Sequence, residues 1–164
     1  MATTMELIES VTLGSTATSV TFSSIPGTMT DLLLVCSLRD QGSGTQSYAE
    51  VTSNLGASSG RALYTFSGTV YSATTFLQVR TCSTLATANT FASGSVYIPN
   101  YAGSTNKSAS AESASEDNSA NGPVILIGAA LWASTSAITS LTITPANPNL
   151  VSGSSAFLYG ITKS

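Results

Sequence analysis

The sequence predicts an all-β protein, an antiparallel β-sandwich of jelly-roll type with about 8 to 10 short strands. Short apolar or alternating runs are separated by Gly, Ser, Asn and Pro throughout the chain. No run keeps the i, i+3, i+4, i+7 spacing of apolar residues that marks an amphipathic helix. Val, Ile and Thr, whose branched side chains pack well on a pleated sheet, are frequent in these runs. We expect a single β-sandwich domain over residues 1–164, because this length is typical of one domain.

Turn residues divide the first part of the chain into candidate strands. Gly14-Ser15 separates the first two, and Pro26-Gly27 forms the next turn because Pro presets φ and Gly accepts φ > 0. The run that begins at Asp31 is apolar on both faces at its start, which indicates a central strand. The strands expected here are residues 6–13, 18–24, 31–39, 48–52 and 61–66.

The second part of the chain continues the same pattern. Residues 107–116 carry small or charged side chains and are predicted to form an edge strand, because charges there discourage pairing with another chain. Residues 124–132 are the most apolar run and the candidate core strand. Pro145 ends the run before it, since proline removes a ladder donor. The strands expected here are residues 74–81, 91–99, 107–116, 124–132, 138–144 and 156–162.

The chain carries unusually few charges. Charged residues make up 8% of the sequence, where about 25% is usual, and the net charge is −3. The basic residues do not cluster, and strong phosphate binding needs several in one patch. We therefore expect neither nucleic acid nor a membrane surface as a partner. A neutral surface suits a protein that packs against neighbours in an assembly. The basic residues are Arg39, Arg61, Arg80, Lys107 and Lys163.

The sequence predicts a protein that is not an enzyme. It contains no histidine, which removes the commonest general base and metal ligand. A serine nucleophile would depend on Lys107 or Lys163, and Gly42-Ser43-Gly44 lacks the lysine of a phosphate-binding loop. We expect no catalytic, cofactor-binding or metal-binding residue and no cofactor.

One acidic cluster is a candidate ligand or catalytic site. A glycosidase needs two facing carboxylates, and the run that carries Glu112 and Glu116 is predicted to be solvent-exposed. Oxygen ligands in this cluster could hold Ca²⁺, yet the regular spacing of a calcium loop is absent. The favoured interpretation is a solvated strand end and turn. The cluster consists of Glu112, Glu116, Asp117 and Asn118.

Three aromatic residues are the candidate contact residues of the surface. Tyr71 and Tyr101 lie in polar loops, which favours exposed contacts. Trp132 ends the most apolar run, so packing in the core or against another subunit is favoured over a platform for a sugar ring. Cys36 alternates with apolar residues and is expected to be a small buried side chain, and no disulfide is predicted. No signal peptide or bilayer-spanning run is recognised, so we expect a soluble protein synthesised in the host cytoplasm.

One further comparison concerns segments along most of the chain, namely residues 6–13, 20–26, 30–35, 95–101, 106–108, 131–132, 138–143 and 158–161. These segments resemble small virion proteins of tailed bacteriophages, especially marine and cyanobacterial ones. The resemblance implies a non-catalytic structural part of the particle and brings no catalytic residues.

Two functions fit this resemblance. The first is a capsid decoration or cement protein, a homotrimer on the outer capsid surface that bridges subunits of the major capsid protein. Many weak, largely neutral contacts would add up there through multivalency. The alternative is a tail or fibre component that binds a host surface glycan.

Overall fold

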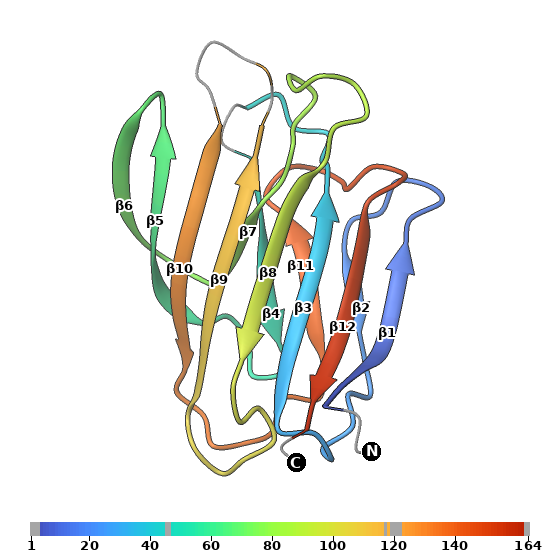
Figure 1. Ribbon diagram of the computed structural model, residues 1–164, viewed down its shortest axis with the longest axis vertical. Coiled ribbons are helices and arrows are strands. Elements are labelled where there is room, and N and C mark those ends of the chain that lie inside the picture. Colours follow the sequence, from blue (N-terminus) through green and yellow to red (C-terminus); the bar gives the residue numbers. More distant parts are fainter. Residues whose placement is uncertain (1–3, 45–46, 117, 119–122, 163–164) are drawn as a thin grey trace.

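The computed structural model describes residues 4–44, 47–116, 118 and 123–162. These residues form strands and loops, and none of them forms a helix long and apolar enough to cross a membrane. The strands build two antiparallel sheets that pack face to face (Figure 1), which confirms the predicted all-β sandwich. They are β1 (Met5–Thr12), β2 (Val20–Phe22), β3 (Asp31–Leu38), β4 (Tyr48–Ser53), β5 (Ser59–Phe66), β6 (Thr69–Thr75), β7 (Gln78–Arg80), β8 (Ala92–Ile98), β9 (Lys107–Ser115), β10 (Val124–Trp132), β11 (Leu141–Pro145) and β12 (Ser155–Ile161).

The two sheets differ in size. The larger has 8 strands in the order β1-β12-β3-β8-β9-β10-β5-β6, and the smaller has 4 in the order β2-β11-β4-β7. If the hairpins β5–β6 and β9–β10 are left out, two four-stranded layers remain. These are β1-β12-β3-β8 in the larger sheet and β2-β11-β4-β7 in the smaller one. Two four-stranded layers are what a jelly roll contains, and jelly-roll topology itself stays a prediction. Both extra hairpins lengthen the larger sheet.

The core lies between the sheets and follows from strict alternation along the strands. In β3, Leu32, Leu34, Cys36 and Leu38 are buried on the inner face. Phe22 and residues of β4 and β11 pack against them from the smaller sheet. Each fully buried side chain of this size stabilises the fold by about 1.5–3 kcal/mol. The predicted central position of this strand is confirmed, since β3 lies between β12 and β8.

The strand expected at residues 61–66 is β5, whereas β6, and with it the β5–β6 hairpin, was not predicted. One strand was expected at residues 74–81, but β6 ends at Thr75 and β7, in the other sheet, begins at Gln78. Ser67 and Gly68 join β5 to β6 with φ of 48° and 74°. Two adjacent residues with φ > 0 form the type I′ turn that suits a two-residue hairpin. The hairpin ends the larger sheet and leaves most of β6 exposed.

The prediction that residues 107–116 form an edge strand was wrong. β9 lies inside the larger sheet and pairs with both β8 and β10. Its burial alternates along its whole length, with Ala109 and Ala111 facing the core. Small inner side chains let β7 of the smaller sheet approach closely, and the Arg80 backbone N–H donates to Ser113 Oγ at 2.9 Å. The charge at Lys107 points inward, where it does not block strand pairing.

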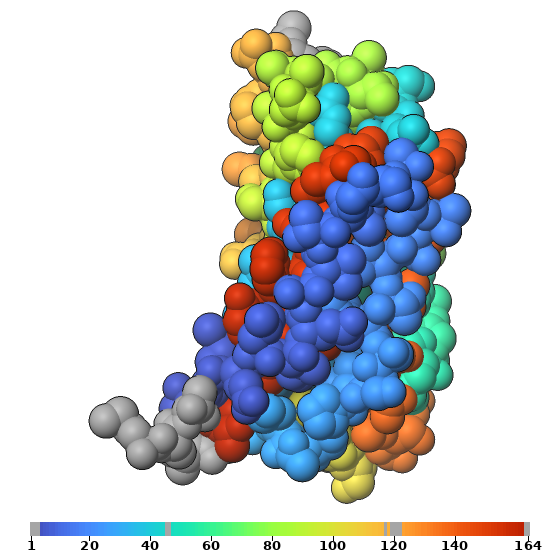
Figure 2. Space-filling view, turned by 90° about the vertical axis from the view of Figure 1, so that its right-hand side faces the viewer, coloured from blue at the N-terminus to red at the C-terminus, as the bar shows by residue number. Residues whose placement is uncertain are grey.

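The N-terminal segment covers one edge of the sandwich. Figure 2 shows this edge, where β1 and the chain that leads to β2 (blue) lie across the junction of the two sheets. β1 pairs with β12 and has an irregular register between Leu7 and Glu9. An irregular edge strand discourages pairing with another chain.

Candidate functional site on the outer face

The outer face is the face of the eight-stranded sheet that points away from the smaller sheet, toward the viewer in Figure 1. Strand register places its side chains in rows across the strands. One row contains Val35 on β3, Ser95 on β8, Glu112 on β9, Ile127 on β10 and Leu63 on β5. Neighbouring members of a row stand about 5 Å apart, so they form one continuous surface.

An apolar ridge runs along β10 and onto β5. We define it as Leu63, Ile125, Ile127 and Leu131, whose side chains are 54%, 49%, 64% and 41% exposed. Single exposed apolar residues are common, but a group of them on one sheet face is a candidate surface for contact with another molecule. The ridge is therefore the clearest sign of a binding surface on the described part of this molecule.

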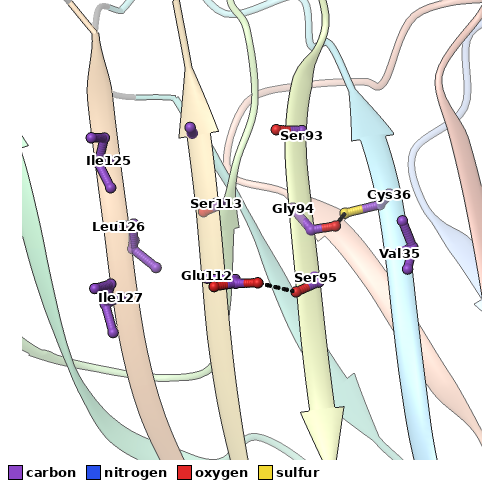
Figure 3. Close-up of a pocket in the computed structure, with 11 residues that line it drawn as sticks. Val35, Cys36, Ser93, Gly94, Ser95, Glu112, Ser113, Ile125, Leu126 and Ile127 are labelled. Carbon is purple, nitrogen blue, oxygen red and sulfur yellow. Dashed lines mark hydrogen bonds between the residues drawn. The ribbon is translucent and has the colours of Figure 1, made fainter.

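A groove lies beside the ridge, over β8 and β9. It exists because those strands present small side chains outward between the ridge and Val35 (Figure 3). Two adjoining hollows of about 420 Å³ each share Ser95, Glu112 and Ile127. The small outward residues of these two strands, the groove residues, are Ser93, Ser95, Ser110 and Ala114.

Glu112 places one carboxylate in the middle of the groove. Ser95 Oγ donates a hydrogen bond to Glu112 Oε1 at 3.2 Å, and the Glu112 side chain is exposed (Figure 3). The residues that line the two hollows include no second carboxylate, no histidine and no lysine. One carboxylate without an acid or base partner supplies a charge for recognition, not the pair that glycoside hydrolysis requires.

Arg61 is the one basic side chain of the exposed class among the residues that the structure describes. It lies on the outer face of β5, two residues from Leu63 and opposite Ala129. The guanidinium of Arg39 is engaged instead by the carbonyls of Ala86 and Thr87 at 3.1 and 2.9 Å. The outer face therefore combines an apolar ridge with charges of both signs, among them Arg61 and Glu112.

The structure buries two of the three candidate contact residues. Tyr101 is fully buried, and its hydroxyl donates to the carbonyl of Pro26. Its expected exposure was wrong, because the polar sequence around it gives no sign of a packed aromatic ring. Trp132 is also buried, and its Nε1–H donates to the carbonyl of Gly56 at 3.0 Å. This burial agrees with the packing that the sequence favoured for Trp132. Tyr71 is 42% exposed and stacks on Tyr64 with ring centroids 5.5 Å apart.

The acidic cluster is divided by the fold. Glu112 faces outward from β9, whereas the carboxylate of Glu116 accepts a hydrogen bond from the backbone N–H of Asn118 at 2.7 Å. Asp117 lies outside the described residues. Within the described ranges, no group of three or more Cys, Asp or Glu side chains could hold a metal ion.

Sequence reasoning missed the ridge. The run at residues 124–132 was interpreted as core because it is apolar throughout, but alternate residues of β10 point outward. The signal was present, since an antiparallel strand normally has one polar, solvated face. In such a sheet, a strand that is apolar on both faces predicts that its outer face contacts another layer or another molecule.

Arg80 is a buried cation without a counter-charge in contact. Its side chain is 3% exposed, and Nε and Nη2 have no hydrogen-bond partner among the described residues. The guanidinium lies 6.0 Å from the centre of the Tyr64 ring. Burial lowers the pKa of Arg80 to about 10, against the smaller opposing effects of Tyr64 and Asp40. The charged form is therefore less stable in the folded protein than in water.

Arg80→Met is expected to raise the free energy of unfolding at pH 7 by about 1–3 kcal/mol, because it removes a desolvated charge whose Nε and Nη2 make no hydrogen bond to a described residue. The folded pKa of about 10 lies below the usual pKa of arginine, so the burial cost is fully present below pH 10. The gain in stability should shrink as the pH rises above 10. Urea denaturation at pH 7 and near pH 11 measures it.

The matched control is Arg39→Met, which removes hydrogen bonds to several backbone carbonyls and should lower stability. A loss of stability in Arg80→Met as large as in Arg39→Met would contradict the interpretation of Arg80 as an unpaired buried charge.

The fold and this surface define the class of the protein: an all-β sandwich whose candidate site is an exposed apolar ridge beside a groove. No protein-family model matches the chain, and neither a curated protein nor a solved structure matches it.

Proposed function

We propose that the protein is a structural subunit of a virus particle, a decoration or cement protein on the outer capsid of a tailed phage. The observation that carries this proposal is the exposed apolar ridge on a domain with very low charge. Such a surface is suited to lasting contact with other protein subunits. The resemblance of the sequence to phage virion proteins is the reason for proposing a virus particle as the assembly.

In this role the protein adds buried area between neighbouring shell subunits. Each contact is modest, and many copies together strengthen the shell through multivalency. The proposed partners are the major capsid protein and other copies of this chain. The predicted homotrimer stays a prediction.

The copy number of the protein in purified particles tests this role. Quantitative mass spectrometry would compare its peptides with those of the major capsid protein. We expect a ratio close to that of the capsid protein, because only the shell offers so many equivalent sites. A small fraction of that ratio would favour a tail or fibre part over a decoration protein. Absence from the particle would overturn both.

One observation favours the tail or fibre alternative. Tyr71, exposed on β6 and stacked on Tyr64, presents an aromatic surface on which a sugar ring could stack. Under this alternative, the isolated protein binds host cells, and Tyr71→Ala abolishes that binding. Phe76→Ala provides the control, because this exposed ring lies outside the stacked pair.

A further inference from the structure

We propose that the outer face pairs with the outer face of a second copy of the chain, across a two-fold axis that runs parallel to the strands between β9 and β10. The inference rests on the proposed role as an assembly subunit, and it puts a two-fold dimer in place of the homotrimer expected from the sequence. It starts from two adjacent features of one sheet face, the ridge and the groove.

The ridge and the groove are complementary in size. In strand register, Ile125 lies beside Ala114, and Leu63 lies in the same row as Ser95. The proposed two-fold axis places β10 of each copy over β9 of the other, and β5 over β8. Ile125 then faces Ala114 of the second copy, and Leu63 faces Ser95. Large side chains meet small ones at these two places, as the interdigitation of two packed sheets requires, and Ile127 of each copy lies over Glu112 of the other.

The exposed charges are complementary under the same rotation. Arg61 of the second copy comes to lie over Tyr97 on β8, one strand across and two residues along from Glu112 on β9. A long guanidinium side chain spans this diagonal. The pair forms twice, once on each side of the axis. Covering Glu112 with the ridge would desolvate its carboxylate, so a cationic partner is needed at this place.

A second copy fits this face better than an unrelated partner. The filling side chains and the spaces that they fill lie side by side on one face, as an isologous interface requires. Glu112 lies within the groove, and the exposed basic residue of the described chain, Arg61, lies on the same face. Because ridge and groove adjoin on one sheet, face-to-face packing about a two-fold axis satisfies both at once.

Charge reversal tests the pairing. Sedimentation equilibrium of the full chain over a range of concentrations should show a dimer. Glu112→Arg and Arg61→Glu should each weaken dimerisation by about tenfold or more, because each places two like charges together. The double variant should restore the wild-type dissociation constant to within a few fold. Glu9→Arg makes the same charge change on the edge strand β1 and should leave it unchanged.

A second variant addresses the apolar contact. Ala114→Phe fills the groove from the exposed face of β9 and should abolish dimerisation while far-UV circular dichroism stays unchanged. A monomer or a trimer in solution, or a double variant as weak as the single ones, would overturn the inference. Those results would leave the copy-number test of the virion role standing. A dimer that is absent from particles would overturn the virion role alone.

Discussion

Lys107→Met is expected to lower the free energy of unfolding by about 3–5 kcal/mol. Lys107 is fully buried at the start of β9, and its ammonium group donates to three backbone carbonyls. These belong to Gly103 at 2.5 Å, to Thr105, and to Thr135 at 3.5 Å. Methionine fills a similar volume and leaves all three carbonyls without this donor. A hydrogen bond to a charged group contributes about 1.5–3 kcal/mol, and the substitution removes all of them.

The expected sign is opposite to that of Arg80→Met, although both changes remove a buried cation. The difference is that Lys107 holds two loops together through its hydrogen bonds, whereas Nε and Nη2 of Arg80 bond to no described atom. Urea denaturation followed by far-UV circular dichroism measures both changes. A loss below about 1 kcal/mol for Lys107→Met would show that the carbonyls are satisfied by water once the lysine is gone.

Trp132→Ala is expected to destabilise the protein by about 3–5 kcal/mol. The indole is among the largest fully buried side chains, and it closes the core at the end of β10. Alanine would leave a cavity and would also leave the Gly56 carbonyl without its indole donor. Trp132→Phe keeps most of the apolar volume and should cost clearly less. The same urea titration measures both variants.

Equal losses in the alanine and phenylalanine variants would contradict this account, since they would assign the whole effect to the hydrogen bond. Trp132 and Lys107 are also register partners across β9 and β10. Their effects should therefore not add in the double variant, because both side chains support the same end of the sandwich.

Strand positions could be predicted from the sequence wherever one face of a strand meets the core. The run at residues 31–39 is an example, because its apolar residues between Asp31 and Arg39 match the bounds of β3 to within one residue. The β6 strand of the β5–β6 hairpin could not be predicted, because it lies at the edge of the larger sheet and buries little apolar surface. Its sequence therefore shows weak alternation. Its signal was the Ser67-Gly68 turn, which is local chemistry and not periodicity.

The candidate site was harder to predict because it depends on sheet order. Ile125 and Ile127 are exposed only because no layer covers the outer face of β10, and the sequence does not state which layers exist. Likewise, Tyr101 lies in a polar loop, and only the fold brings the carbonyl of Pro26 to its hydroxyl. The sequence next to Ile125, Ile127 or Tyr101 does not show which distant segments will lie near these residues.

The position of β12 between β1 and β3 has a consequence for how the protein is made. A ribosome releases β1 and β3 long before residues 155–161, yet neither strand can complete its pairing until that last segment arrives. The larger sheet therefore cannot assemble strand by strand during translation. We expect folding to wait for residues 155–161 and to be slow, as in other folds dominated by contacts between distant parts of the chain. Until then, β3 has an unpaired apolar edge, which is prone to aggregation.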